Sequence, residues 1–556
     1  MDEIRLGVFI CHCGTNIAGF IDVASVEEYA KTLPNVVFTQ RNLYTCSETG
    51  LLAIKNGIKD NNLNRVIVAA CTPRTHEPLF RGICNEMGVN PYFFEFVNIR
   101  EQCSWVHQKN KKKATLKARD LIRMGVARAA LLQPLEKFQI DVEPSTLIIG
   151  GGITGMSAAT VLANQGYHVI IVEKDTELGG QLRYHYLLYP GDMESEKLLS
   201  IREEILTNPN IEVHTSSTIK NIDGYIGNFD ITILKDKKEL KFGVGTIIVA
   251  TGTDVLKPEG LFNYDGKRVI TQKELELIFK NNHFNYKKIV MIQCVGSRNK
   301  ERPYCSSICC MTAMKNARII KKENPDAEVV ILNRDIYTSG TYQETFYREA
   351  REMGIIFTRY TESNPPKVTK DSVIYYNESL KDDIEIKCDL VVLSTPLVTY
   401  HEESEKLSKM LKVPLDEFGF FLEAHVKLRP VDFSNDGIFV AGTCKWPANV
   451  PESISQGYAA ASRVTRIISK DSFTVEGATA WIDQEKCIGC EVCFKKCGYK
   501  AITRDEEDHV IVRTVLCKGC GVCSTTCPQH AIVIKHYTDD QVDSQISALL
   551  EVDLIE

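Results

Sequence analysis

Residues 146–180 read TLIIGGGITGMSAATVLANQGYHVIIVEKDTELGG and predict a strand, a glycine turn, a helix and a second strand that ends at Glu173. A dinucleotide needs this order. Glycines let the backbone approach its pyrophosphate, the helix N-terminus attracts its charge, and the acid accepts its ribose hydroxyls. The stretch therefore predicts a Rossmann-type cofactor domain. Its expected contact residues are Gly150, Gly152, Gly155, Glu173, Lys174, Gly180 and Gln181.

Two later segments favour FAD over NAD. Residues 246–252 (TIIVATG) resemble the ATG motif of two-dinucleotide flavoproteins, and residues 436–443 (DGIFVAGT) resemble their later flavin-contacting strand, although Thr443 replaces the usual acid. Residues 453–461 (SISQGYAAA) predict a helix whose N-terminal amides face the flavin pyrimidine and stabilise its charge when reduced. The expected FAD contacts here are Ala250, Thr251, Gly252, Gly442, Thr443, Ser453 and Gln456.

Residues 286–395 have the outline of a second Rossmann unit but lack its glycine turn, because residues 293–310 read QCVGSRNKERPYCSSICC. One glycine cannot give the pyrophosphate approach that three provide, so we expect no nicotinamide nucleotide here. We predict a [4Fe–4S] cluster at this turn, where a hydride donor would otherwise meet the flavin. Two alternatives stay open: a strained dithiol of adjacent cysteines, and buried inert thiols. The predicted ligands are Cys294, Cys305, Cys309 and Cys310.

The C-terminal part contains two matching cysteine runs, each spaced C-x2-C-x2-C-x3-C. Such a duplicated run is typical of a bacterial ferredoxin with two [4Fe–4S] clusters, in which the fourth cysteine of each run reaches the other cluster. Zinc motifs pair two CxxC units and leave that fourth cysteine without a role. We therefore expect one cluster on Cys487, Cys490, Cys493 and Cys527, and the other on Cys517, Cys520, Cys523 and Cys497.

The N-terminal residues 1–135 predict a separate α/β domain with strands at 6–10 and 65–70. Cysteines at the ends of these strands lie where α/β sheets bind ligands, which permits a further cluster. A C-x-C spacing alone is weak evidence for a metal site, so reduced thiols beside a docking surface stay an equal alternative. The candidate ligands are Cys11, Cys13, Cys46, Cys71 and Cys103, whereas Cys388 and Cys444, further along the chain, are expected in hydrophobic cores.

The composition limits where the chain works. The 66 basic residues are slightly outnumbered by 72 acidic ones, which argues against a nucleic-acid partner. No apolar run approaches the ~20 residues of a transmembrane helix, and the acidic N-terminus does not resemble a secretory signal. The twenty cysteines fall at cofactor spacings rather than in a small disulfide framework. We expect a cytoplasmic protein of an anaerobe.

The expected fold class is α/β, in five consecutive parts. The middle three parts are expected to form a thioredoxin-reductase-like flavoprotein core with two Rossmann units. In order, the parts are an N-terminal α/β domain (1–135), the first part of the FAD domain (145–285), a degenerate second Rossmann domain (286–395), the second part of the FAD domain (396–472) and a bacterial-type two-cluster ferredoxin domain (478–540).

Three stretches carry a family resemblance: residues 8–23 (VFICHCGTNIAGFIDV), 66–80 (VIVAACTPRTHEPLF) and 293–317 (QCVGSRNKERPYCSSICCMTAMKNA). They resemble the A-type flavin component of heterodisulfide reductase from methanogens and related anaerobes, and the likeness covers essentially the whole chain. The resemblance implies a [4Fe–4S] cluster beside the flavin at the cysteine-rich turn. It also places Lys315 near the isoalloxazine, where a cation helps stabilise reduced flavin; the alternative is a surface lysine. Longer members carry an inserted ferredoxin module that this sequence lacks.

The resemblance also implies a role in electron bifurcation or its reverse, confurcation. Its implied partners are B- and C-type subunits, a hydrogenase or formate dehydrogenase as electron-input module, and ferredoxin, around a homodimer of this chain. Disulfide reduction is expected on a partner, because this chain lacks the cysteine-rich CCG modules that build the disulfide-cleaving partner. Three alternatives stay open: a flavin subunit of the quinone-modifying type, a self-contained NAD(P)H-dependent flavin oxidoreductase, and an adaptor that only relays electrons.

Overall fold

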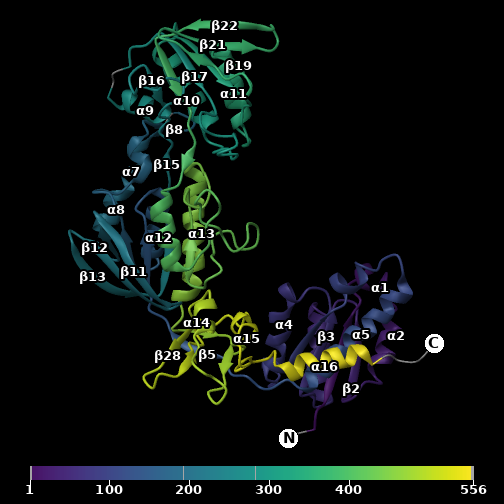
Figure 1. The fold of residues 1–556 in the computed structure, drawn as a ribbon. Helices are drawn as coiled ribbons and strands as arrows, with labels where there is room; N and C mark the ends of the chain where they lie inside the picture. The colour runs from purple at the N-terminus through teal and green to yellow at the C-terminus, as the bar shows by residue number, and fades with distance from the viewer. Residues whose placement is uncertain (1–2, 192, 282–283, 552–556) are drawn as a thin grey trace. The chain divides into compact units, whose positions relative to one another are not determined.

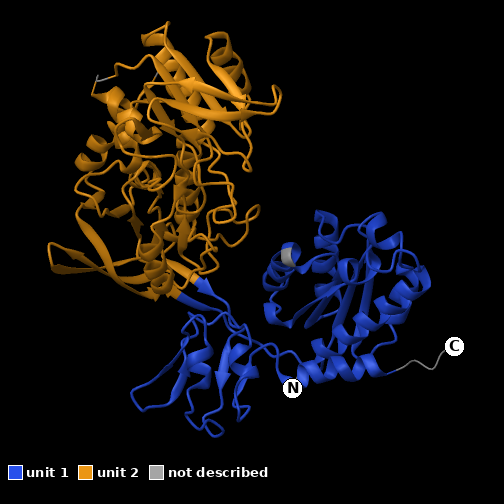
Figure 2. Ribbon diagram, turned by 45° about the horizontal axis from the view of Figure 1, so that its top comes forward, with its two compact units in different colours: residues 1–139, 474–556 blue, residues 140–473 orange. Residues whose placement is uncertain are grey.

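The computed structural model describes residues 3–191, 193–281 and 284–551, and it divides into two compact units (Figure 2). The central unit comprises residues 140–473. The terminal unit combines residues 1–139 with residues 474–556.

The central unit contains a five-stranded parallel sheet in the order β10-β7-β6-β14-β25 (Figure 1). Its helices α6 and α13 pack together on one face, and the antiparallel sheet β11-β12-β13 with helix α12 covers the other. Burial on both faces explains why these strands read as continuous apolar runs. The bounds are β6 (Ser145–Ile149), α6 (Ile153–Asn164), β7 (His168–Val172), β10 (Ile211–His214), β11 (Ser217–Tyr225), β12 (Asn228–Lys235), β13 (Lys238–Val244), β14 (Thr246–Val249), α12 (His401–Leu411), β25 (Ile438–Val440) and α13 (Val450–Ile468).

A second parallel sheet of the central unit has the order β16-β23-β17-β18-β19. Helices α9, α10 and α11 cover one face, and the antiparallel sheet β20-β21-β22 covers the other. The antiparallel pair β15 (Asp254–Val255) and β24 (Leu397–Val398) joins the two halves. The bounds are β16 (Val269–Thr271), α9 (Gln272–Lys280), β17 (Lys288–Ile292), α10 (Cys309–Glu323), β18 (Glu328–Asn333), α11 (Gln343–Glu352), β19 (Ile356–Arg359), β20 (Lys367–Val368), β21 (Ser372–Asn377), β22 (Asp382–Lys387) and β23 (Leu390–Leu393).

The terminal unit holds a four-stranded parallel sheet in the order β2-β1-β3-β4. Helices α2 and α5 cover one face, and helices α3 and α4 cover the other. The bounds are β1 (Leu6–Cys11), α2 (Val23–Ala30), β2 (Val36–Asn42), α3 (Glu48–Asp60), β3 (Arg65–Ala70), α4 (Pro73–Glu86), β4 (Phe94–Asn98) and α5 (Lys111–Ala130).

The C-terminal part of this unit has two short hairpin-like pairs and two one-turn helices. Its last helix, α16 (Asp539–Leu550), packs on α5, where the Arg123 side chain donates to the Ala548 carbonyl at 2.6 Å. The other bounds are β27 (Ala480–Ile482), α14 (Val492–Lys496), β28 (Ile502–Arg504), β29 (Val510–Val512), α15 (Val522–Thr525) and β30 (Ile532–Ile534).

The α/β fold class, with a thioredoxin-reductase-like two-sheet core and a C-terminal two-cluster ferredoxin domain, is confirmed. Among the described helices, none combines the length and the apolar character that crossing a membrane requires.

Candidate cofactor-binding sites

The glycine turn after β6 presents bare backbone to a cavity. Gly150 has a φ of +110°, and a Cβ built there would lie 2.2 Å from the Ala250 carbonyl oxygen, so only glycine fits. The Gly151 amide donates to the Glu173 carboxylate at 2.6 Å, which anchors this half-turn to the end of β7. Backbone and acid are therefore positioned as a dinucleotide requires.

A cavity of about 980 Å³ opens at this turn, at the upper end of the roughly 300–1,000 Å³ usual for ligand pockets. It runs from the glycine turn of the first sheet to helix α10 of the second half. Room and shape suit an extended dinucleotide such as FAD. The predicted residues that line it are Gly150, Gly152, Glu173, Lys174, Gly180, Gln181, Ala250, Thr251, Gly252, Lys315, Thr443 and Ser453.

Three predicted residues do not line the cavity and support its walls instead. A Cβ on Gly155 would lie 2.0 Å from the Gly150 carbonyl oxygen, so this glycine lets α6 pack closely on β6. The Gly442 amide donates to the Gln456 side-chain oxygen at 2.9 Å, which ties the end of β25 to α13.

The N-terminus of α13 also lines the cavity, through Val450 and Pro451. Asn449 caps the helix by accepting from the Glu452 amide at 2.9 Å, and Glu452 returns the contact in a capping box. Pro451 carries no N–H group, so the cavity meets the positive end of the helix dipole more than a set of free amides. That charge favours an anionic group in the cavity.

At the other end of the cavity lies Lys315, which is only 4% exposed. Its Nζ donates to the Glu276 carboxylate and, at 2.6 Å, to the Leu187 carbonyl. Burial lowers the pKa of Lys315, while Glu276 opposes this change. Burial also disfavours ionised Glu276, yet His185, 3.7 Å away, and Lys315 outweigh it and lower the pKa of Glu276 to about 2. The site holds a fixed carboxylate beside a buried amine.

The four cysteines of the glycine-poor turn come together at the carboxyl edge of the second sheet. Cys294 follows β17, Cys305 lies in the loop, and Cys309 and Cys310 begin α10. Burial raises the pKa of the Cys309 thiol, and the three other thiols raise it further. Burial also raises the pKa of Cys310 to about 11. Ionising these thiols together needs a nearby cation, which the iron of a cluster supplies.

In the N-terminal domain four of the five candidate cysteines lie together. Cys11 ends β1 and accepts from the Thr45 amide at 3.4 Å, and Arg100 donates to Cys13 at 3.6 Å. Cys46 and Cys71 interact electrostatically with both Cys11 and Cys13. Cys103 instead donates to the Ala114 carbonyl at 3.1 Å under helix α5. The geometry therefore selects four thiols from the five.

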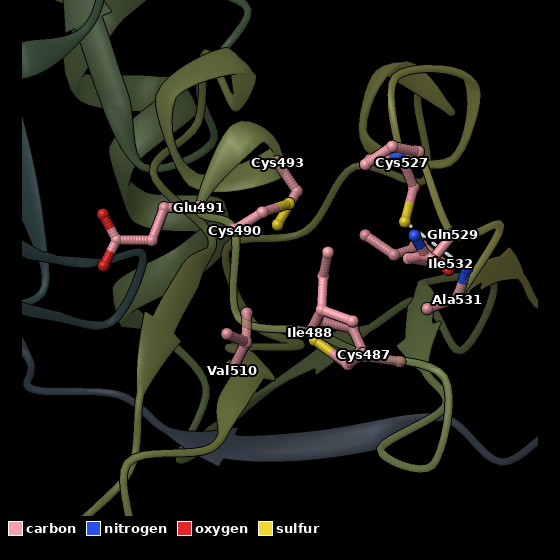
Figure 3. A pocket seen from close by; sticks show the side chains of 12 residues that line it. Cys487, Ile488, Cys490, Glu491, Cys493, Val510, Cys527, Gln529, Ala531 and Ile532 are labelled. Carbon is pink, nitrogen blue, oxygen red and sulfur yellow. Dashed lines mark hydrogen bonds between the residues drawn. The ribbon is translucent and has the colours of Figure 1, made fainter.

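The C-terminal runs line two separate small cavities. One is lined by Cys487, Cys490 and Cys493 together with Cys527 of the second run (Figure 3). The other is lined by Cys517, Cys520 and Cys523 together with Cys497 of the first run. The fourth cysteine of each run thus crosses to the other group. Across the described part of the chain, no three His, Cys, Asp or Glu side chains meet closely enough to hold a single metal ion.

Two residues of these sites were missed by sequence reasoning. Glu276 lies in α9 (QKELELIFK), where a glutamate that alternates with apolar residues gives no sign that it is 1% exposed. Gln293 was quoted only as the start of the cysteine-rich turn, yet its side chain is fully buried. Cys388 and Cys444 are both buried, as expected of core residues.

Comparison with known families assigns both parts of the chain. The pyridine nucleotide-disulphide oxidoreductase model matches residues 144–461. The 4Fe-4S dicluster domain model matches residues 480–534.

Full-length relatives are all A-type iron-sulfur components of heterodisulfide reductases. The chain is 37% identical to the one from the CoB--CoM heterodisulfide reductase of Methanocaldococcus jannaschii, over 98% of each chain. It is 36% identical to the second such protein of Methanopyrus kandleri, over 92% of this chain and 93% of that one. It is 35% identical to the one from the H(2):CoB-CoM heterodisulfide,ferredoxin reductase of Methanothermobacter thermautotrophicus, over 99% and 98%. The 655 aligned positions of the first comparison exceed the 556 residues here by 99, so that relative contains segments without a counterpart in this chain.

Proposed function

This chain belongs to the family of A-type heterodisulfide reductase components, and from that premise we propose that it joins an electron-input module, ferredoxin and a disulfide-reducing partner through one FAD and several [4Fe–4S] clusters. It is a flavin and iron–sulfur oxidoreductase subunit. The proposal concerns which residues hold the cofactors, which partners exchange electrons, and whether the electron pair is split between two acceptors.

One observation carries the proposal: a single helix, α10, serves both the FAD cavity and the four-thiol group. Cys309 and Cys310 begin the helix, and Lys315 lines the cavity five residues later. At 1.5 Å rise per residue, Cys310 and Lys315 are separated by about 8 Å along the helix axis. A cluster held at the helix start would therefore be a near neighbour of the flavin, where a nicotinamide would enter in related flavoproteins.

The chain's residues divide the work. Bound FAD supplies two-electron chemistry, and bound [4Fe–4S] clusters supply one-electron chemistry. The glycine turn and Glu173 hold the dinucleotide, and Lys315, fixed by Glu276, presents a positive charge near the flavin. The four thiols around α10 hold a third cluster, and Cys11, Cys13, Cys46 and Cys71 hold a fourth. The crossed C-terminal runs hold the two ferredoxin-type clusters, which we assign to exchange with a partner.

We assign disulfide reduction to a partner protein. The relatives are named as A-type components, and one name gives both heterodisulfide and ferredoxin as reactants, which supports B- and C-type partners and two electron acceptors. Two acceptors of different potential are what bifurcation requires. A hydrogenase or formate dehydrogenase is the proposed electron-input module, and a relative named H(2)/formate supports that choice. A homodimer of this chain would lie within the complex.

The rival function is that of a self-contained NAD(P)H-dependent flavin oxidoreductase, which the pyridine nucleotide-disulphide oxidoreductase match favours. It predicts flavin bleaching when NADPH is added anaerobically to the purified chain. Our proposal predicts no bleaching with NADPH or NADH, and full bleaching with dithionite or reduced ferredoxin.

The third cluster is tested by iron and flavin quantitation with redox-poised EPR on a Cys309→Ala/Cys310→Ala variant. We expect FAD to be retained and one cluster signal to be lost. Cys388→Ala is a matched control, because Cys388 is a buried cysteine of the same half that contacts Arg268 instead. Unchanged iron and spectra in the double variant would refute the third cluster.

A further inference from the structure

Gln293, directly after β17, carries a buried amide without a hydrogen-bond partner in the chain. The residue is 0% exposed, and neither its Oε1 nor its Nε2 atom has a partner. Burying an unpaired amide is costly, so such groups are rare in native proteins and call for a partner outside the polypeptide. Both atoms are unpaired, so an N–H group lacks an acceptor whichever way the amide is turned.

The side chain of Gln293 points to the α10 face of the sheet. Side chains alternate along β17: Ile289 and Met291 pack in the core under α10, whereas Val290 and Ile292 pack in the core on the other face. The Gln293 amide donates to the Leu332 carbonyl at 2.9 Å, so the strand geometry continues through this residue. Alternation therefore places Gln293 with Ile289 and Met291.

The same strand ends fix the position of the thiols. The Cys309 thiol donates to the Thr395 carbonyl at 3.5 Å, just after β23, and the Cys310 thiol lies 3.8 Å from the Asp335 carbonyl, just after β18. In the sheet β17 lies between β23 and β18, with Ile292 opposite Leu393 and Leu332. Gln293 therefore ends the strand between the two strand ends that the thiols contact.

Neighbouring polar side chains do not satisfy this amide. Ser394, beside Gln293 on β23's side, accepts instead from Gln272 at 3.1 Å. Asn333, beside it on β18's side, has an unpaired Oδ1 atom of its own. The buried polar layer under the start of α10 is incomplete without a further group at the thiols.

We propose that the Gln293 carboxamide donates a hydrogen bond to a sulfur of the cluster held by Cys294, Cys305, Cys309 and Cys310, and thereby raises its reduction potential. The inference rests on the proposed third cluster. Hydrogen bonds to sulfur stabilise the more negative, reduced cluster, and they are one of the protein's means of setting the potential. Gln293 is a positioning residue in this scheme, because it acts through the cluster.

The first test is the substitution Gln293→Leu in the full chain. We expect full iron and FAD content and a lower midpoint potential for the EPR signal that Cys309→Ala/Cys310→Ala removes. The expected size is about tenfold in the reduction equilibrium, or about 59 mV for a one-electron couple. Gln165→Leu, at the exposed end of α6, is the control and should leave the potential unchanged. An unchanged potential in Gln293→Leu at full loading would overturn the inference.

A second measurement does not depend on the folding of a variant. Pulsed EPR on the unsubstituted chain, grown with glutamine labelled with ¹⁵N in its side chain, should show coupling of the labelled nitrogen to the same cluster signal. Absence of coupling would overturn the inference and indicate that water satisfies the amide. If the double cysteine variant loses no signal, the third cluster itself fails. If that signal is lost but carries no coupling, only the role of Gln293 fails.

Discussion

Lys315 donates a hydrogen bond to the Glu276 carboxylate inside the wall of the FAD cavity, and the two side chains are only 4% and 1% exposed. A buried amine without this partner would lose its proton readily, because burial disfavours its charge. The Tyr186 amide also donates to Glu276 at 2.9 Å, so the carboxylate is held from the backbone. The pair fixes one positive charge where the sequence family suggests the flavin ring.

Replacing Glu276 with Gln should weaken the hold of Lys315 on its proton. Glu276 raises the pKa of Lys315 against burial, so its removal lowers that pKa further. Reduced flavin should then be stabilised less, by about tenfold in the reduction equilibrium, or about 30 mV for a two-electron couple. A spectroelectrochemical titration of flavin absorbance measures this shift. Glu349→Gln is the control, since Glu349 pairs with Arg318 on the same helix at the surface; equal potentials in both variants would contradict the role of Glu276.

The crossed cysteine runs predict which variants share a spectrum. Cys527→Ser should alter the same EPR signal as Cys487→Ser, because both residues line one cavity. Cys497→Ser should alter the same signal as Cys517→Ser. Redox-poised EPR of the four single variants checks this pairing. If Cys527→Ser altered the signal of Cys517→Ser instead, each run would hold its own cluster.

In the N-terminal domain, Cys13→Ala and Cys103→Ala should behave differently. Cys13 lies with the other strand-end thiols and accepts from Arg100, whereas Cys103 bonds only to a helix carbonyl among its described contacts. We expect Cys13→Ala to lose about four iron atoms per chain, the content of one cubane cluster, and Cys103→Ala to lose none. Iron analysis of the purified chain measures both. Equal iron content in the two variants would favour reduced thiols without a cluster.

The link between the C-terminal segment and the N-terminal domain should loosen in acid. Burial, with Arg128 and Arg81 nearby, lowers the pKa of His536 to about 3, from 6.5 in the unfolded chain. The folded chain therefore binds fewer protons than the unfolded chain below pH 6.5, so the stability that His536 gives is complete above pH 6.5 and declines as pH falls toward 3. At pH 5 the loss is about 2 kcal/mol.

Amide hydrogen exchange in α16, corrected for intrinsic rates, checks this prediction at pH 7.5 and pH 5. His536 has a φ of +74°, which asparagine tolerates, so His536→Asn should remove the dependence on pH without disturbing the backbone. His530→Asn is the matched control, because His530 also has a positive φ, of 49°, but is exposed. Equal pH dependence in wild type and His536→Asn would rule out this histidine as the cause.

Short-range patterns in the sequence determined the fold class and the kinds of cofactor. The glycine turn with Glu173, the two cysteine runs and the glycine-poor turn at residues 293–310 each depend on spacings within one strand-turn-helix segment. Such spacings fix local backbone geometry and ligand chemistry together, so they can be read without knowing how distant segments pack.

Only the tertiary structure decided which distant residues meet. It separated Cys103 from the other N-terminal thiols, moved Gly155, Gly442 and Gln456 from the cavity surface to its supporting walls, and revealed the partners Glu276 and Gln293. These outcomes depend on which face of a helix or strand is buried and on what lies opposite it. Burial changes the energy of a charge or an amide by its surroundings, and those surroundings come from segments far apart in the chain.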